Sequence, residues 1–271
     1  MPSIAESFEN ILDFIRLHFV QVMIYQVLFF TFYLIVSVIF GGLFFAFFTG
    51  EHISFGSLGN IMIIGVILFT MIALVQFGGY PILVKQAIQN EKIKVSTVIG
   101  ETFRNFHRII ATALITGFIT FLPLIIITLL SIFYVFNVIP YFLSPENIVV
   151  GRHLPPTEHI VFLSIGFIVS GIITLYLLAR SWLSIPILMV EESGILDSLN
   201  RSWLMSSRRA MRMIFAIIVF GLIVCLLIWL LSLIPFVGFL VSYLFLGPLI
   251  GAYPSVYYYV LREELAKKPC I

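Results

Sequence analysis

Residues 213–261 read MIFAIIVFGLIVCLLIWLLSLIPFVGFLVSYLFLGPLIGAYPSVYYYVL, a run of 49 positions without Asp, Glu, Lys or Arg. A transmembrane helix needs about 20 mostly apolar residues, because each residue advances ~1.5 Å through a hydrocarbon layer of ~30 Å. The run is therefore long enough for two spans. Its centre, Ile234-Pro235-Phe236-Val237-Gly238, predicts the break between them, since proline lacks a backbone donor and glycine permits a turn.

Four further apolar stretches precede this run. Residues 17–50, 52–84 and 109–145 carry no Asp, Glu, Lys or Arg, and residues 159–190 carry only Arg180. Each stretch is long enough for one span. The sequence therefore predicts an all-α integral membrane protein with six transmembrane helices, forming a single polytopic domain over residues 1–271. The alternative is five spans, if residues 213–261 hold one long helix and a re-entrant segment.

The composition agrees with this class. Hydrophobic residues make up 61% of the chain and charged residues 10%, whereas soluble domains have about 45–50% and about 25%. This composition excludes an ordinary water-soluble domain. The two cysteines, Cys225 and Cys270, cannot form a disulfide framework. The N-terminus has acidic residues before Arg16 instead of the basic start of a secretory signal, so we expect it to be retained.

The basic residues are distributed unevenly between the two sides of the predicted membrane. With six spans, one side receives the N-terminus, residues 85–108, residues 191–212 and the C-terminus. Thirteen of the fifteen Lys and Arg residues lie there. The positive-inside rule then predicts that both termini are cytoplasmic, and that the proline-rich residues 141–158 form an outer loop.

A five-residue pattern of Ile, any residue, acid, hydroxyl and bulky apolar residue recurs along the chain. It occurs at residues 4–8, 99–103 and 195–199, always before a basic segment and an apolar span. A proline also recurs late in every second span, at Pro81, Pro186 and Pro254. The pattern predicts three pseudo-repeats, each an amphipathic interfacial helix plus two spans. Their limits are about 1–90, 91–190 and 191–271. Ordinary cytoplasmic loops with little helix are the alternative.

Two segments resemble a known family. The opening Met1-Pro2-Ser3-Ile4-Ala5-Glu6-Ser7, and residues 186–192 followed by Arg201-Ser202-Trp203-Leu204, resemble the YciC-type inner-membrane proteins of bacteria. The second segment is also similar to the membrane domain attached to some glycerophosphodiester phosphodiesterases. The resemblance implies a bacterial inner (cytoplasmic) membrane and a six-helix layout. The family is largely uncharacterised, and the phosphodiesterase domain is missing here, so the resemblance implies no active site.

Arg180 is the only Lys, Arg, Asp or Glu inside a predicted span. A charge near the centre of a membrane helix costs about 2.5–3.5 kcal/mol on insertion scales, so such residues are often functional. Two interpretations stay open. The long side chain could reach the headgroups or pair structurally. Alternatively, Arg180 could form an intramembrane polar site with Gln76 and Tyr80 of the equivalent span.

Basic residues also cluster in the two predicted cytoplasmic segments. Three interpretations are open. The clusters could bind anionic lipid headgroups, with about 1 kcal/mol of binding free energy per charge. They could instead contact a protein partner, or only determine the topology. The candidate contact residues are Lys92, Lys94, Arg104, Arg108, Arg208, Arg209 and Arg212.

The sequence lacks the usual signs of an enzyme. There are no paired carboxylates inside the spans, no nucleophile with an adjacent base and no phosphate-binding glycine loop. We therefore expect no cofactor, no metal and no nucleic-acid partner, although His153, Glu158 and His159 leave a divalent-metal site open in the outer loop.

The leading hypothesis is a non-enzymatic scaffold, accessory or lipid-interacting module of the inner membrane. Its expected partners are membrane lipids and another protein. The alternative is a carrier that moves a small or amphiphilic solute through the interface between the repeats. A polar cavity at that interface would favour the carrier, and a solid apolar interior would count against it.

Overall fold

The computed structural model describes residues 4–48, 55–89, 91–137, 157–207, 209–234 and 237–267. Within these ranges every regular element is a helix. Six helices are long and apolar enough to cross a membrane, which confirms the all-α class and the expected number of spans. They cover Phe19–Leu43, Gly59–Ile88, Phe106–Tyr134, Val161–Val190, Ala210–Ser232 and Ser242–Ala266.

The elements follow one another in a regular order, in which a short helix precedes two long ones. The first group is α1 (Ile4–Leu17), α2 (Phe19–Phe48) and α3 (Phe55–Ile88). The second group is α4 (Val95–Arg104), α5 (Phe106–Asn137), α8 (Thr157–Ser181) and α9 (Ser184–Val190). The third is α10 (Ile195–Ser206), α11 (Ala210–Ser232), α12 (Val237–Val241), the π-helix η1 (Ser242–Leu246) and α13 (Gly247–Lys267).

The predicted break in residues 213–261 is present. Helix α11 ends at Ser232 and α12 begins at Val237. The backbone N–H of Gly238 donates to the carbonyl of Ile234 over 2.8 Å. A Cβ at Gly238 would lie 1.7 Å from the carbonyl oxygen of Leu231, so only glycine fits this turn. Two helices long and apolar enough to span a membrane flank the break, which favours six spans over the five-span alternative.

The span predicted over residues 159–190 is interrupted. Helix α8 ends at Ser181, and α9 begins at Ser184 after a turn at Trp182 and Leu183. A proline clashes with the carbonyl four residues earlier, which for Pro186 is that of Trp182. The interruption therefore lies where Pro186 disfavours a continuous helix.

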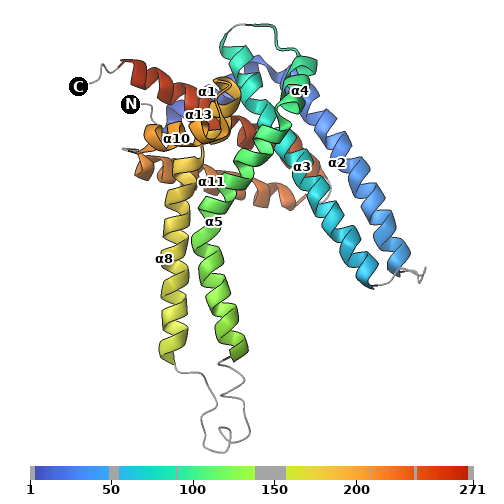
Figure 1. Cartoon of the computed structure of the whole chain (residues 1–271). Coiled ribbons are helices and arrows are strands. Elements are labelled where there is room, and N and C mark those ends of the chain that lie inside the picture. Colours follow the sequence, from blue (N-terminus) through green and yellow to red (C-terminus); the bar gives the residue numbers. More distant parts are fainter. Residues whose placement is uncertain are drawn as a thin grey trace, which may run out of the picture.

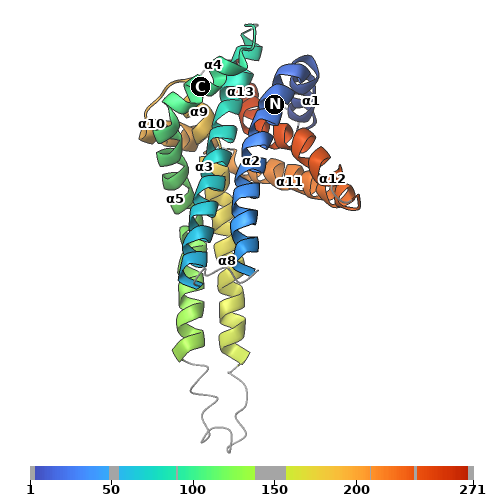
Figure 2. The same ribbon diagram turned by 90° about the vertical axis from the view of Figure 1, so that its right-hand side faces the viewer.

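The long helices meet at one end of the molecule and diverge at the other. The pair α2–α3 separates from the pair α5–α8 (Figure 1), while α11 and α12 project in a third direction (Figure 2). Both termini lie at the end where the pairs meet. We call this end the base; it consists of α1, α4, α9, α10 and residues 257–267 of α13.

The helix contacts at the base form a closed sequence. Helix α4 packs on α3, α10 packs on α8 and α9, and α1 packs on α13. The first long helix of each group also touches the preceding group: α5 contacts α3, α11 contacts α8, and α2 contacts η1 and α13. The helices α3, α9 and α13 contact one another. The third group of helices thereby contacts the first group.

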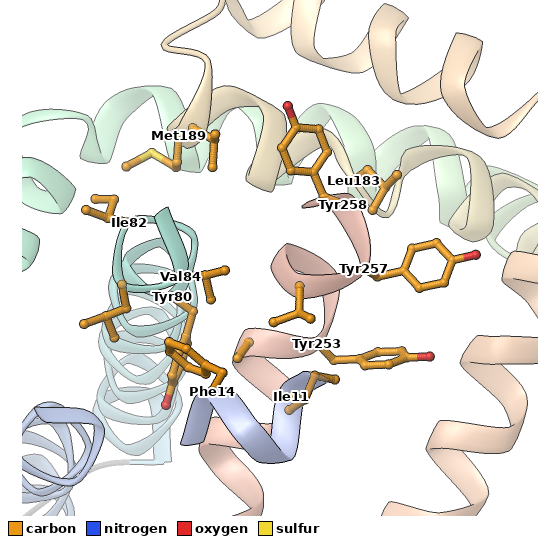
Figure 3. Close-up of a cluster of buried hydrophobic side chains, with 14 of the residues drawn as sticks. Ile11, Phe14, Tyr80, Ile82, Val84, Leu183, Met189, Tyr253, Tyr257 and Tyr258 are labelled. Carbon is orange, nitrogen blue, oxygen red and sulfur yellow. The ribbon is translucent and has the colours of Figure 1, made fainter. Parts of the chain in front are cut away.

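The buried core lies at the base. Figure 3 shows side chains from α1, α3, α13 and the region of α9 gathered in one cluster. Away from the base, most of the long-helix surface is exposed and apolar. In a membrane, acyl chains cover such a surface without any cost of burying polar groups. Representative members of the cluster are Ile11, Phe14, Tyr80, Val84, Leu183, Met189, Tyr253 and Tyr258.

Candidate functional site: an intramembrane polar network and an ionic base

A hydrogen-bonded network joins the first and third groups of helices inside the spans. The Oε1 atom of Gln26 accepts from Gln76 Nε2 over 2.8 Å and from Tyr80 Oη over 2.6 Å. The Nε2 atom of Gln26 donates to the Tyr243 carbonyl over 2.7 Å, and Tyr243 Oη donates to Gln76 Oε1 over 3.3 Å. Gln26 and Gln76 are 0% and 3% exposed, so the network is buried.

The local backbone makes room for these amides. Tyr243 lies in the π-helix η1, which departs from the regular α-helical hydrogen-bond pattern. A Cβ at Gly247 would lie 2.2 Å from Gln26 Nε2, and a Cβ at Gly251 would lie 2.2 Å from the Tyr80 ring. The two glycines therefore let α13 approach the side chains of α2 and α3 closely.

The polar atoms of the network bond to one another and to the backbone of the same chain. The two amide oxygens and the Nε2 atoms of Gln26 and Gln76 all have partners within it, and Tyr25 Oη adds a hydrogen bond to the Gln76 carbonyl over 2.8 Å. An unpaired amide in an apolar medium is costly, so such pairs hold helices in a fixed register. Its clearest role is to hold α2, α3 and η1 together.

The structure brings two of the three predicted intramembrane residues together. Gln76 and Tyr80 share the network, whereas Arg180 has its contacts with Tyr176 and with Trp203 of α10. The register explains the separation. Gln76 lies five residues before Pro81, and the residue five before Pro186 is Ser181. Arg180 is one position further back and therefore points about 100° away around the helix.

Arg180 fixes α10 to the end of α8. Its Nη1 donates to Tyr176 Oη over 2.8 Å, its Nη2 donates to the Trp203 carbonyl over 3.0 Å, and the guanidinium lies 5.1 Å from the centre of the Trp203 ring. Ser202 Oγ donates to the Arg180 carbonyl over 2.7 Å, and Ser206 Oγ reaches the same oxygen over 3.4 Å. These hydroxyls satisfy a carbonyl at the helix end, where the α-helical partner is missing.

The loop after α9 collects contacts from all three groups. Lys85 of α3 lies 3.8 Å from Glu192, and Arg108 of α5 donates to the carbonyls of Glu192 and Ser193. Tyr258 of α13 donates to Glu191. Each contact reaches this short loop from a different part of the chain. The loop therefore ties the groups together at the base.

The same loop is joined to α10 by Arg201. This arginine lies 2.6 Å from Glu191 and 2.9 Å from Asp197. The hydrogen bonds to Asp197 and then to Glu191 raise the pKa of Arg201 above its ordinary value. A raised pKa of a cation means that its contribution is present at low pH and is lost only as pH rises through that value. The contact therefore persists across physiological pH.

The seven predicted headgroup contacts fall into three groups. Arg108 is engaged with the loop, and Arg209 lies 3.9 Å from Glu264, so both serve the internal structure. Arg208 lies outside the described residues, as does His153 of the predicted outer loop. The side chains of the remaining four are exposed: Lys92, Lys94, Arg104 and Arg212.

Sequence reasoning missed part of this arrangement. Gln26 and Tyr243 complete the network, and Glu191 is the acceptor at the centre of the base. Gln26 could have been found, because an uncharged amide in a span requires a partner. The partner role of the Tyr243 carbonyl has no sequence signal, since it depends on the π-helix.

Comparison with known proteins adds no relative. No protein-family model matches the chain, and neither a curated protein nor a solved structure matches it. The resemblance to YciC-type proteins stays a prediction from short motifs. Within the described residues, His, Cys, Asp and Glu form no group of three that could hold a metal ion.

Proposed function

We propose that this chain is a non-enzymatic, lipid-interacting scaffold of the bacterial inner membrane, whose base binds anionic headgroups. The observation that carries the proposal is the α4 surface, which consists of Lys92, Lys94, Phe103 and Arg104. All four side chains are exposed, and Phe103 is 56% exposed. A bulky aromatic residue among cations, beside a span, is typical of a helix in the headgroup region.

The other side of α4 faces the protein. Val98 and Thr102 are fully buried, and a Cβ at Gly79 of α3 would lie 3.2 Å from Thr102 Oγ1. The helix is thus fixed to α3 through one side and leaves Phe103 and Arg104 exposed, while Lys92 and Lys94 are exposed in the segment just before it. This arrangement supports the proposal because it holds the three cations near the end of a span, and none of them forms an ion pair with another residue that the structure describes.

The scaffold has three pseudo-repeats in this proposal. The closed sequence of contacts at the base supports them, because each group meets its neighbours through equivalent elements. Equivalent polar positions support them too. Tyr25 bonds to the backbone of Gln76, which lies five residues before Pro81. Thr120 follows residues 99–103 at the distance at which Tyr25 follows residues 4–8, and it lies 3.1 Å from Ser181, five residues before Pro186. The third group has Ala216 and Leu249 at these positions, which carry no polar side chain.

The base faces the cytoplasm in this proposal. Thirteen of the fifteen Lys and Arg residues belong to the termini and to the segments that connect the groups. Positive residues near span ends are retained on the cytoplasmic side, where the leaflet carries anionic lipids. The three cations proposed to bind headgroups are therefore among the charges that set the orientation.

A carrier is the second candidate function, and one observation favours it: the helix pairs diverge away from the base (Figure 1). The base itself opposes it. Leu83 of α3, Ile187 of α9 and Ala252 of α13 are all 0% exposed at the place where these helices meet. A solute would have to separate this packed interface, so the scaffold is the function that we retain.

The test is lipid retention by the purified full-length chain. The triple variant Lys92→Gln, Lys94→Gln and Arg104→Gln should retain anionic phospholipid at least tenfold less than the original chain, since each charge contributes about 1 kcal/mol. Native mass spectrometry from mixed phosphatidylglycerol and phosphatidylethanolamine nanodiscs gives the ratio. The double variant Arg16→Gln and Arg262→Gln is the control, because both arginines are exposed and lie on other helices. Equal retention by the triple variant would refute headgroup binding.

A further inference from the structure

A pocket of about 310 Å³ opens at the base between α1, α3 and α13. Binding pockets for small molecules begin at about this volume. Its apolar lining comes from all three helices and includes Phe14, Val84 and Val256. All three belong to the buried core cluster, and Figure 3 labels two of them, Phe14 and Val84. The floor of the pocket is therefore part of the rigid interior of the protein.

The charge of the pocket is opposite to that of the rest of the base. Asp13 and Glu263 line it, and no Lys or Arg does. Neither carboxylate has an ion-pair partner among the residues that the structure describes. Glu191 and Glu192, by contrast, are both paired with cations. Two unpaired carboxylates beside an apolar floor favour a ligand that is both positive and apolar.

Aromatic side chains supply the remaining wall. His18 and Tyr259 line the pocket together with Phe14, and the rings of Phe14 and His18 lie 5.8 Å apart. The faces of aromatic rings attract organic cations, above all alkylated ammonium groups. A bare divalent ion is a poor fit, because Ca²⁺ requires six to eight oxygen ligands and this mostly apolar lining offers two carboxylates and the amide of Asn10.

We propose that this pocket binds an alkylammonium group, with the ammonium between Asp13 and Glu263 and the alkyl part on Phe14 and Val84. The site is separate from the α4 surface and does not depend on anionic headgroups. Two sources share this chemistry: the ethanolamine headgroup of a membrane lipid, and a soluble aliphatic amine. The pocket lies at the ends of α1 and α3, where either source can reach it.

The test is equilibrium dialysis of radiolabelled hexyltrimethylammonium against the full-length chain in dodecyl maltoside, with empty micelles as the blank. We expect saturable binding at one site. The variant Asp13→Asn with Glu263→Gln should weaken it at least tenfold, and Ala87→Phe should block it sterically. Glu9→Gln removes an acidic residue of α1 outside the lining and should change the affinity less than twofold.

Two lipids then distinguish the source. Displacement of the probe by phosphatidylethanolamine and not by phosphatidylglycerol identifies the lipid headgroup, whereas displacement by neither identifies a soluble amine. Equal displacement by both would show that the acyl chain and not the ammonium is recognised, and would overturn the proposal. So would the absence of saturable binding, or equal binding by the double carboxamide variant. The two carboxylates are exposed, so this variant keeps the test valid if Ala87→Phe fails to fold.

Discussion

Gln26 is the residue on which the intramembrane network depends. It accepts two hydrogen bonds and donates one, and its partners belong to α3 and η1. Gln26→Leu should leave Gln76, Tyr80 and the Tyr243 carbonyl short of partners. Interhelical hydrogen bonds in membranes contribute about 0.6–1.7 kcal/mol each, so we expect a loss of about 1–3 kcal/mol. Thermal unfolding in detergent should show a midpoint several degrees lower.

The control for this substitution is Thr31→Val in the same helix. Thr31 is exposed, and its hydroxyl bonds only to the carbonyl of Val27 in its own turn over 2.9 Å. Its loss should leave the unfolding midpoint within about a degree of the original. A midpoint for Gln26→Leu as high as that of Thr31→Val would mean that the network does not hold the helices together.

Gly238 is required by backbone geometry alone. Gly238→Ala would place a Cβ 1.7 Å from the Leu231 carbonyl oxygen, and a backbone atom cannot move aside as a side chain can. We expect poor yield and an unfolding midpoint at least five degrees lower. Gly221→Ala is the matched control, because a Cβ there meets nothing within 4 Å and alanine favours a helix. The idea fails if the two alanine variants behave alike in size-exclusion chromatography and thermal unfolding.

The attachment of α10 depends on Arg180 at the end of α8. Arg180→Leu removes the bonds to Tyr176 and the Trp203 carbonyl and the contact with the Trp203 ring. We expect normal insertion, but amide hydrogen exchange at least tenfold faster in α10. Exchange in α4, which packs on α3, is the internal control and should not change. Unchanged exchange in α10 would leave Arg180 without a structural role and would favour a functional one.

The breaks between elements show what the sequence could predict. The six spans could be counted because lipid admits only long apolar helices, and the break near Gly238 could be placed because proline and glycine occur together there. The turn at Trp182 and Leu183 was missed, because the effect of Pro186 falls four residues before it. Pro81 lies within an uninterrupted α3, so proline alone does not predict a break.

The candidate site required knowledge of the tertiary structure. Gln76 and Tyr80 could be named as polar residues in one span, but their partner Gln26 lies in another helix, and their relation to η1 depends on two glycines of α13. The sequence identifies the basic residues, but it does not distinguish those that contact other parts of the protein from those that are exposed. Arg104 ends α4 and Arg108 lies four residues later in α5, and only the second meets the loop after α9.

The direction of the whole molecule in the membrane is the largest-scale prediction. The closed sequence of contacts places α1 beside α13, so both termini lie at the base (Figures 1 and 2). If the base is cytoplasmic, green fluorescent protein fused to either terminus should fluoresce, and alkaline phosphatase inserted after Val150 should be active. The charges that fix this direction include the three cations of the α4 surface. Dark fluorescent-protein fusions at both termini, with inactive phosphatase after Val150, would reverse the orientation and place the α4 cations on the leaflet surface opposite the cytoplasm. Headgroup binding would then lose its electrostatic basis, while the alkylammonium pocket, which depends on Asp13 and Glu263, would keep its own.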